Sequence, residues 1–284
     1  MNINSIGVIG GGTMGRQIAL NTAIYGIEAR VYCRREAVRD EVTAWMEDYM
    51  AGRIKKGRLT EDEASAAKAL FYVTSDFEAA VKGVDCVIEA VSELEEVKRK
   101  TFQQISNAVD GSVLIATNSS FMLSSMFVDC VRNPSRLANM HFYNPALVLK
   151  FVEVVKGPHT SDETAQAMYD FCKRTGKEPI LMKKEIPGFA ANYILRGLQQ
   201  KARELVEGGY CSYEDVDKAC ELGLNHPMGP FRLNDLTGID ISFDIMNEQY
   251  QESGIKPPCY DLYKSMVEQG KLGRKTKQGF YDYR

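Results

Sequence analysis

Short runs of apolar, mostly β-branched residues alternate with longer helical stretches from residue 3 to about residue 185. This rhythm is typical of a mainly parallel β-sheet covered by helices on both faces. The strands that the pattern predicts are Ser5–Gly10, Ala29–Cys33, Val84–Ala90, Val113–Thr117, Leu137–His141 and Phe151–Val155.

Two helices are predicted between the second strand and the third, over residues 36–56 and 61–70. Thr60 stands three residues before Glu63, which is the spacing of a capping box. The second of these helices is therefore expected to begin directly after Thr60.

The strand-like runs stop near residue 185, and the remaining residues are predicted to form helices interrupted by glycine and proline pairs. A helix over 189–207 has a wide apolar face, with Phe189, Tyr193, Ile194 and Leu198 at helical spacing. Such a face must pack against its own domain or a second subunit. We therefore predict an α/β domain over residues 1–185 and an all-helical domain over residues 186–284.

Composition narrows the class of protein. With 284 residues, 44% of them hydrophobic, the chain can bury a substantial core. Its formal charge of −3 argues against a nucleic-acid or anionic-membrane partner. The first residues show no targeting pattern, and no apolar stretch reaches the roughly 18 residues that span a bilayer, so we expect a cytoplasmic protein. Seven scattered cysteines and three histidines suggest neither a disulfide framework nor a metal site.

The sequence Gly10-Gly11-Gly12-Thr13-Met14-Gly15 fits G-x-G-x-x-G between a predicted strand and a predicted helix. In this context Gly10 permits the tight turn, Gly12 lets the backbone approach a pyrophosphate, and Gly15 allows close helix packing. The helix N-terminus, with Thr13 and Met14, offers free N–H groups to the phosphates. The motif predicts a dinucleotide site in a Rossmann-type domain.

The end of the second predicted strand bears on the choice of coenzyme. NAD-selective sites carry an acidic residue about 20 positions after the glycine motif, where it binds the adenosine ribose. Here Cys33 is followed by Arg34 and Arg35, which removes a carboxylate that would repel a 2′-phosphate and adds two cations. This favours NADP(H). The alternative is that both arginines are solvated loop charges and that NAD(H) still binds.

His141 ends one predicted strand, and Glu153 lies twelve residues later inside the next. A carboxylate in an otherwise apolar strand is costly unless it has a partner. An imidazole is its natural partner, because the carboxylate would orient the ring and stabilise its protonated form. The two residues are predicted to form the general acid/base of an enzyme.

Several further motifs occur in order along the chain together with these residues. The full set lies at residues 10–15, 88–93, 117–120, 141–145, 150–153, 186–189 with Asn192, 227–231, 273–276 and 279–281. With these motifs the chain resembles the 3-hydroxyacyl-CoA dehydrogenase family, in particular its stand-alone 3-hydroxybutyryl-CoA dehydrogenases, over essentially its full length. The resemblance implies an oxidoreductase of fatty acid and butanoate metabolism that interconverts L-3-hydroxyacyl-CoA and 3-oxoacyl-CoA with NAD(P)(H).

The resemblance also implies roles for individual residues. His141 would take the 3-hydroxyl proton as hydride leaves C3, and Glu153 would hold His141. Ser119 and Asn192 match the family's ligands of the substrate oxygen. Tyr143 stands where the family more commonly has phenylalanine, which adds a hydroxyl next to these residues.

Other charged positions match the family's binding residues. Lys56 matches a lysine that meets the phosphates of CoA, and Arg53 and Lys55 add to this positive patch, although cations at a helix end can equally be solvated surface charges. Glu89, Glu93 and Lys98 match positions near the coenzyme. The resemblance further implies an acyl-CoA substrate and a homodimer formed through the helical domain.

Two other functions remain open from the sequence. One is a dehydrogenase of the same architecture acting on a free hydroxy acid, of the L-gulonate type, against which the positive patch argues. The other is a protein that binds the coenzyme without catalysis, as a sensor or a lens-type structural protein. A pure binder has no need of a base paired with a carboxylate, so the histidine and the glutamate argue against it.

Overall fold

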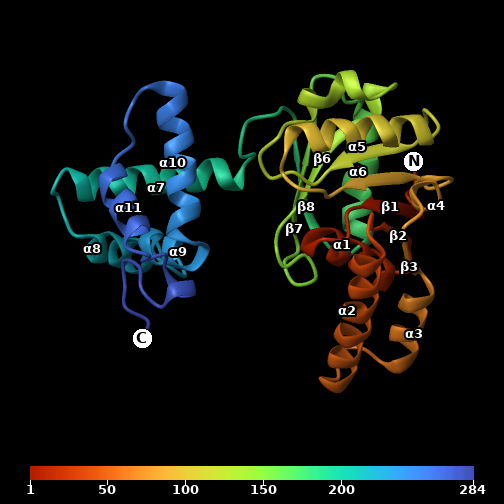
Figure 1. Cartoon of the computed structure of the whole chain (residues 1–284), viewed down its shortest axis with the longest axis horizontal. Helices are drawn as coiled ribbons and strands as arrows, with labels where there is room; N and C mark the ends of the chain where they lie inside the picture. Colours follow the sequence, from red (N-terminus) through yellow and green to blue (C-terminus); the bar gives the residue numbers. More distant parts are fainter. The chain divides into compact units, whose positions relative to one another are not determined.

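The computed structural model describes residues 1–284 and consists of two compact units, Met1–Ala190 and Ala191–Arg284 (Figure 1). The first holds all the strands of the sheet and the second is helical. The division falls close to the boundary predicted at residue 185. No helix of the chain has both the length and the apolar composition needed to cross a membrane.

The sheet of the first unit has the order β3-β2-β1-β4-β5-β6-β7-β8. All neighbouring strands are parallel except β6 and β7, which are antiparallel. The chain moves outward from β1 in one direction through β2 and β3 and in the other through β4, β5 and β6, which confirms the predicted doubly wound Rossmann-type fold. The strands are β1 (Ser5–Ile9), β2 (Glu28–Tyr32), β3 (Phe71–Thr74), β4 (Cys86–Glu89), β5 (Leu114–Thr117), β6 (Leu137–Phe142), β7 (Phe151–Val155) and β8 (Glu178–Met182).

Two of these strands, β3 and β8, were not predicted from the sequence. Both are the edges of the sheet, where a strand has only one neighbour. β8 contains Pro179, which cannot donate to a ladder and is tolerated at an edge. Their apolar runs, Phe71-Tyr72-Val73 and Ile180-Leu181-Met182, are short, and so short a run does not by itself distinguish a strand from a buried helix segment.

Helices cover both faces of the sheet, because consecutive strand residues point to opposite faces. In β4, Ile88 belongs to one core and Val87 to the other. The core containing Ile88 is completed by α1 (Thr13–Ile24), α2 (Glu36–Lys55), α3 (Glu61–Ala69) and α6 (Asp162–Arg174). The core containing Val87 is completed by α4 (Phe77–Val81), α5 (Glu95–Ala108) and the 3₁₀ helix η1 (Ser124–Cys130).

The predicted capping box is present at the start of α3. The Glu63 N–H donates to Thr60 Oγ1 at 3.1 Å, and the Thr60 N–H donates to Glu63 Oε2 at 2.8 Å. Two backbone donors that the helix itself leaves free are satisfied in this way.

The second unit packs short helices around an aromatic core. Its elements are α7 (Ala191–Glu207), α8 (Tyr213–Lys218), the π-helical turn Ala219–Gly223, α9 (Pro230–Thr237), α10 (Ile239–Ser253) and α11 (Tyr260–Glu268). Phe231 and Tyr263 are fully buried within it and pack near Phe280. The predicted helix over 189–207 begins two residues later than expected, because Phe189 has φ +51° and belongs to the first unit.

The turn before α9 has a structural explanation. Asp217 accepts hydrogen bonds from the N–H groups of Phe231 and Arg232 at 2.8 and 2.9 Å, which satisfies the first turn of the helix. A Cβ on Gly229 would lie 2.4 Å from the Asp217 side chain, so only glycine fits there. Pro230 at the first helical position is also favoured.

Candidate active site

The glycine turn between β1 and α1 leaves open space where a ligand could approach the backbone. A Cβ on Gly10 would lie 2.5 Å from Ala90 O, and one on Gly15 would lie 1.9 Å from Gly10 O. A Cβ on Gly12 would meet nothing within 4 Å, and no side chain caps the N-terminus of α1. Gly10 and Gly15 are therefore required by packing, whereas Gly12, Thr13 and Met14 present an uncovered helix N-terminus that fits a pyrophosphate.

The end of β2 has no carboxylate facing the glycine turn. Cys33 is buried, and a Cβ on Gly11 would lie 2.3 Å from its sulfur. Arg34 and Arg35 follow it, both exposed, and neither side chain makes a hydrogen bond or ion pair within the chain. Two unpaired guanidinium groups thus stand directly after the strand that usually carries the ribose-binding acid.

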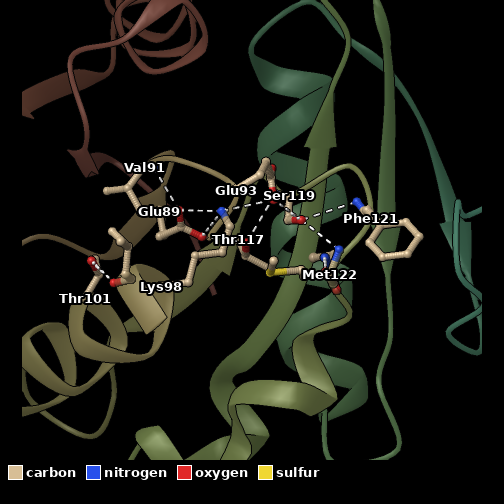
Figure 2. Close-up of polar contacts among 11 residues, drawn as sticks. Glu89, Val91, Glu93, Lys98, Thr101, Thr117, Ser119, Phe121 and Met122 are labelled. Carbon is tan, nitrogen blue, oxygen red and sulfur yellow. Dashed lines mark hydrogen bonds and ion pairs between the residues drawn. The ribbon is translucent and has the colours of Figure 1, made fainter. Parts of the chain in front are cut away.

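A buried ion pair connects β4 to α5 (Figure 2). Lys98 Nζ lies 2.8 and 3.0 Å from the two oxygens of Glu89, and both side chains are almost completely buried. Glu89 also accepts hydrogen bonds from the Val91 N–H at 2.8 Å and from Thr117 Oγ1 at 2.7 Å. The register of β4 and β5 places Glu89 opposite Thr117, at the carboxyl ends of both strands.

The same lysine joins this pair to Ser119. Figure 2 shows the Lys98 ammonium between the carboxylates of Glu89 and Glu93, and its distance to Glu93 Oε2 is 3.6 Å. Ser119 Oγ donates to Glu93 Oε2 at 2.8 Å and accepts from the N–H of Met122 at 2.8 Å. The structure therefore brings together Glu89, Glu93, Lys98 and Ser119, and the sequence had not paired Ser119 with Glu93.

His141 and Glu153 are directly opposite each other in the antiparallel ladder of β6 and β7. Residues opposite each other on neighbouring strands have side chains on the same face. His141 Nδ1 lies 2.9 Å from Glu153 Oε2, and Glu153 is fully buried. The predicted contact is therefore present. With the proton on Nδ1 pointing at the carboxylate, Nε2 is the acceptor nitrogen of the ring, and it has no hydrogen-bond partner in the chain.

Glu153 has further partners on both oxygens. The Ala190 N–H donates to Oε1 at 2.9 Å, and the Tyr143 hydroxyl donates to Oε2 at 2.9 Å. The rings of Phe189 and Tyr143 lie 5.5 and 4.4 Å from the imidazole, measured between centroids. Burial, with the hydrogen bond to Glu153 second, raises the pKa of Tyr143, so this hydroxyl keeps its proton and remains a donor.

The remaining sequence candidates lie in separate places. Asn192 is in the first turn of α7, in the second unit. Arg53 and Lys56 lie at the C-terminal end of α2, without an acidic partner. The Arg53 guanidinium lies 5.9 Å from the ring of Tyr49, which stacks on Trp45. Neither aromatic residue stood out from the sequence, since their helical spacing is also that of ordinary packing.

Gln17 was not singled out from the sequence, and Asn144 was named there only as part of the motif at residues 141–145. Gln17 Nε2 donates to Asn144 Oδ1 at 3.3 Å, which ties α1 to the segment after β6. The signal was the Asn-Pro pair that begins three residues after His141, whose peptide bond is cis in the structure. Its polar contact, however, depends on the fold.

The fold and this geometry define a class of protein: an oxidoreductase with a dinucleotide turn and, in the same unit, an imidazole held by a buried carboxylate. The model of the 3-hydroxyacyl-CoA dehydrogenase NAD binding domain matches residues 5–186, and that of the 3-hydroxyacyl-CoA dehydrogenase C-terminal domain matches residues 188–283. The chain belongs to the 3-hydroxyacyl-CoA dehydrogenase family.

Individual relatives agree with this assignment. The chain is 34% identical over 281 residues to a 3-hydroxybutyryl-CoA dehydrogenase of Clostridioides difficile, covering 98% of this chain and 99% of the relative. The crystal structure of (S)-3-hydroxybutyryl-CoA dehydrogenase from Ralstonia eutropha is similar with a TM-score of 0.90 and 34% identity, with full coverage of both chains. A diketoreductase described as acting on dicarbonyl compounds is similar with a TM-score of 0.88 and 29% identity, again over both full chains.

Proposed function

We propose that this enzyme interconverts L-3-hydroxyacyl-CoA and 3-oxoacyl-CoA, with the 3-hydroxybutyryl-CoA and acetoacetyl-CoA pair as its short-chain substrates. The single observation that carries the proposal is the pair of His141 and Glu153, with Nδ1 on the carboxylate and Nε2 free to exchange a proton. The names of the similar proteins support the thioester substrate.

In this proposal, a nicotinamide coenzyme bound at the glycine turn supplies the hydride-transfer chemistry. His141 Nε2 takes the proton of the 3-hydroxyl group in oxidation and returns it to the 3-oxo oxygen in reduction. Glu153 stabilises the imidazolium that is formed by oxidation and consumed by reduction. A positioned general base contributes roughly 10²–10⁴ in rate.

Other residues would bind and orient the substrate. Ser119 and Asn192 would hold the reacting oxygen beside the imidazole, and Arg53 and Lys56 would meet the phosphates of CoA. Arg53 and Lys56 have no acidic partner, and this supports binding of the CoA phosphates, because no carboxylate competes with the phosphates for these cations.

Arg34 would favour NADPH over NADH by binding the 2′-phosphate. It is exposed, unpaired, and follows a strand end without a carboxylate. A charge-assisted hydrogen bond contributes about 1.5–3 kcal/mol, which corresponds to tenfold or more in relative use of the two coenzymes. Gly12, Thr13 and Met14 would contact the pyrophosphate, while Glu89, Glu93 and Lys98 would lie near the coenzyme, with the buried pair of Glu89 and Lys98 holding Glu93 in place.

The test is the reduction of acetoacetyl-CoA, followed by loss of coenzyme absorbance with NADH and NADPH in parallel. We expect His141→Ala to lower kcat by 10²-fold or more and the control His226→Asn to leave it unchanged. Arg34→Ala should lower the preference for NADPH, whereas Arg58→Ala, another exposed and unpaired arginine, should not. Equal coenzyme use by wild type and Arg34→Ala would refute the role of Arg34.

Free substrates separate this function from its alternatives. The turnover of acetoacetate, gulonate and a CoA-free dicarbonyl compound is compared with that of acetoacetyl-CoA. The dicarbonyl compound is included because the chain is similar to the diketoreductase. Faster turnover of any free compound would contradict the thioester substrate. Coenzyme binding without turnover of any of them would favour the non-catalytic alternative.

We further propose a homodimer formed through the helical unit, in the cytoplasm. Tyr193 and Ile194 on α7 and Ile241 on α10 are more than half exposed, which favours a second copy as their cover. Six cysteines are buried as free thiols, in keeping with a reducing compartment. Light scattering would give twice the chain mass for wild type and a lower mass for Ile194→Lys.

A further inference from the structure

Tyr143 lies two residues after His141, and its ring packs between His141 and Phe151. The centroid distances are 4.4 Å to the imidazole and 5.3 Å to Phe151. The hydroxyl donates to Glu153 Oε2 at 2.9 Å, which is the same oxygen that faces His141 Nδ1 at 2.9 Å. One carboxylate oxygen is thus shared by two donors.

The shared oxygen couples the tyrosine to the imidazole. Each donor withdraws negative charge from Oε2, so the hydroxyl reduces the stabilisation that the carboxylate gives to a protonated imidazole ring. The hydroxyl also restrains Glu153, whose other oxygen is held by the Ala190 N–H. Removing the hydroxyl should leave more charge facing Nδ1, and the imidazolium should then persist to higher pH.

Glu153 is the one charged side chain that is hydrogen-bonded or ion-paired to the imidazole. From β7 it meets the Glu153 carboxylate, from the segment after β6 the Tyr143 hydroxyl, and from the segment before α7 the uncharged ring of Phe189. Because burial keeps the tyrosine protonated, its effect on Glu153 is constant across the working pH range.

We propose that Tyr143 is a positioning residue that shares the Glu153 carboxylate with His141 and thereby sets the pH range in which His141 exchanges the substrate proton. This inference rests on the proposed role of His141. Tyr143 itself need not touch the substrate, since it acts through Glu153.

The kinetic test measures kcat/KM against pH in both directions for wild type and Tyr143→Phe. Oxidation needs the neutral ring, and reduction needs the protonated ring. Without the hydroxyl, the acid limb for oxidation and the alkaline limb for reduction should both move to higher pH, by about half a unit to one unit. Tyr72→Phe, a change at an exposed tyrosine of β3, should move neither limb.

Two outcomes of this test would overturn the inference. One is a profile for Tyr143→Phe that coincides with wild type, and the other is a lower rate at all pH values without a shift, as a purely structural hydroxyl would give. A double-mutant cycle adds a further requirement. In a Glu153→Gln background the Tyr143→Phe change should no longer move the limbs, and a shift that persists there would contradict the route through Glu153.

A spectroscopic arm keeps the inference separate from the proposed function. The chain has three histidines, so the ring nitrogens of His141 can be assigned in ¹⁵N spectra with His159→Asn and His226→Asn variants. The midpoint of protonation of His141 should be higher in Tyr143→Phe than in wild type and Tyr72→Phe. If wild type turns over no substrate, the proposed function fails while this titration still decides the role of Tyr143; an unchanged midpoint refutes it.

Discussion

The buried pair of Glu89 and Lys98 makes a quantitative prediction for Lys98→Met. Both side chains are at most 1% exposed, so the substitution leaves a carboxylate in the interior without its cation. Breaking a buried ion pair by removing one partner costs about 3–5 kcal/mol. Two hydrogen bonds to Glu89 remain, from the Val91 N–H and Thr117, so we expect a loss near the lower end, about 3 kcal/mol.

The assay can follow the first unit alone. Trp45 is the only tryptophan and lies in α2, so its fluorescence during urea unfolding reports on the unit that contains the ion pair. Removing the charge of both partners, as in Glu89→Gln with Lys98→Met, should restore about half of the lost stability or more, because no unpaired buried charge remains.

A matched control is the exposed pair of Lys173 and Glu178 in the same unit. Lys173→Met should cost less than about 1 kcal/mol, since solvent screens the pair. The reasoning would be refuted if Lys98→Met cost no more than this control, or if the double variant were less stable than Lys98→Met by itself.

Three further predictions follow from other contacts. Gly15→Ala should lower the unfolding midpoint, because its Cβ would lie 1.9 Å from Gly10 O. Gly12→Ala should retain stability yet weaken coenzyme binding in calorimetry, and the opposite pattern for the two variants would contradict this account of the turn. Asp235→Asn should loosen the C-terminal segment, which hydrogen–deuterium exchange would detect, because its carboxylate accepts the N–H groups of Phe280 and Tyr281. Burial lowers the pKa of Lys177 from 10.5 to about 8, so between pH 8 and pH 10.5 the unfolded chain binds more protons than the folded chain. The free energy of unfolding should therefore rise with pH over this range, and Lys177→Met should remove the rise.

Much of the nucleotide end of the first unit was predictable from local sequence. The glycine motif, the central strands and the capping box at Thr60 depend on backbone sterics and on contacts a few residues apart, so a short stretch of sequence contains the whole cause. The edge strands β3 and β8 were missed because their apolar runs are short, and a short apolar run fits a strand and a buried helix segment equally well.

The pair of His141 and Glu153 shows where sequence reasoning ended. An isolated carboxylate in an apolar strand required a partner, and that requirement could be read from the sequence. The sequence did not reveal that Tyr143 would share the same oxygen, because a hydroxyl's partner depends on where the segment after β6 returns toward β7.

By itself, the sequence determined the class of fold, the position of the dinucleotide turn and the residues that needed partners, since propensity, periodicity and burial cost act along the chain. Only the tertiary structure decided which partners they received. The antiparallel register of β6 and β7 sets His141 opposite Glu153, and the close packing of β4, β5 and α5 joins Glu89, Lys98 and Ser119 through Glu93. Hydrogen bonds and ion pairs require contact within a few ångströms, and for residues far apart in the chain only the folded structure supplies it.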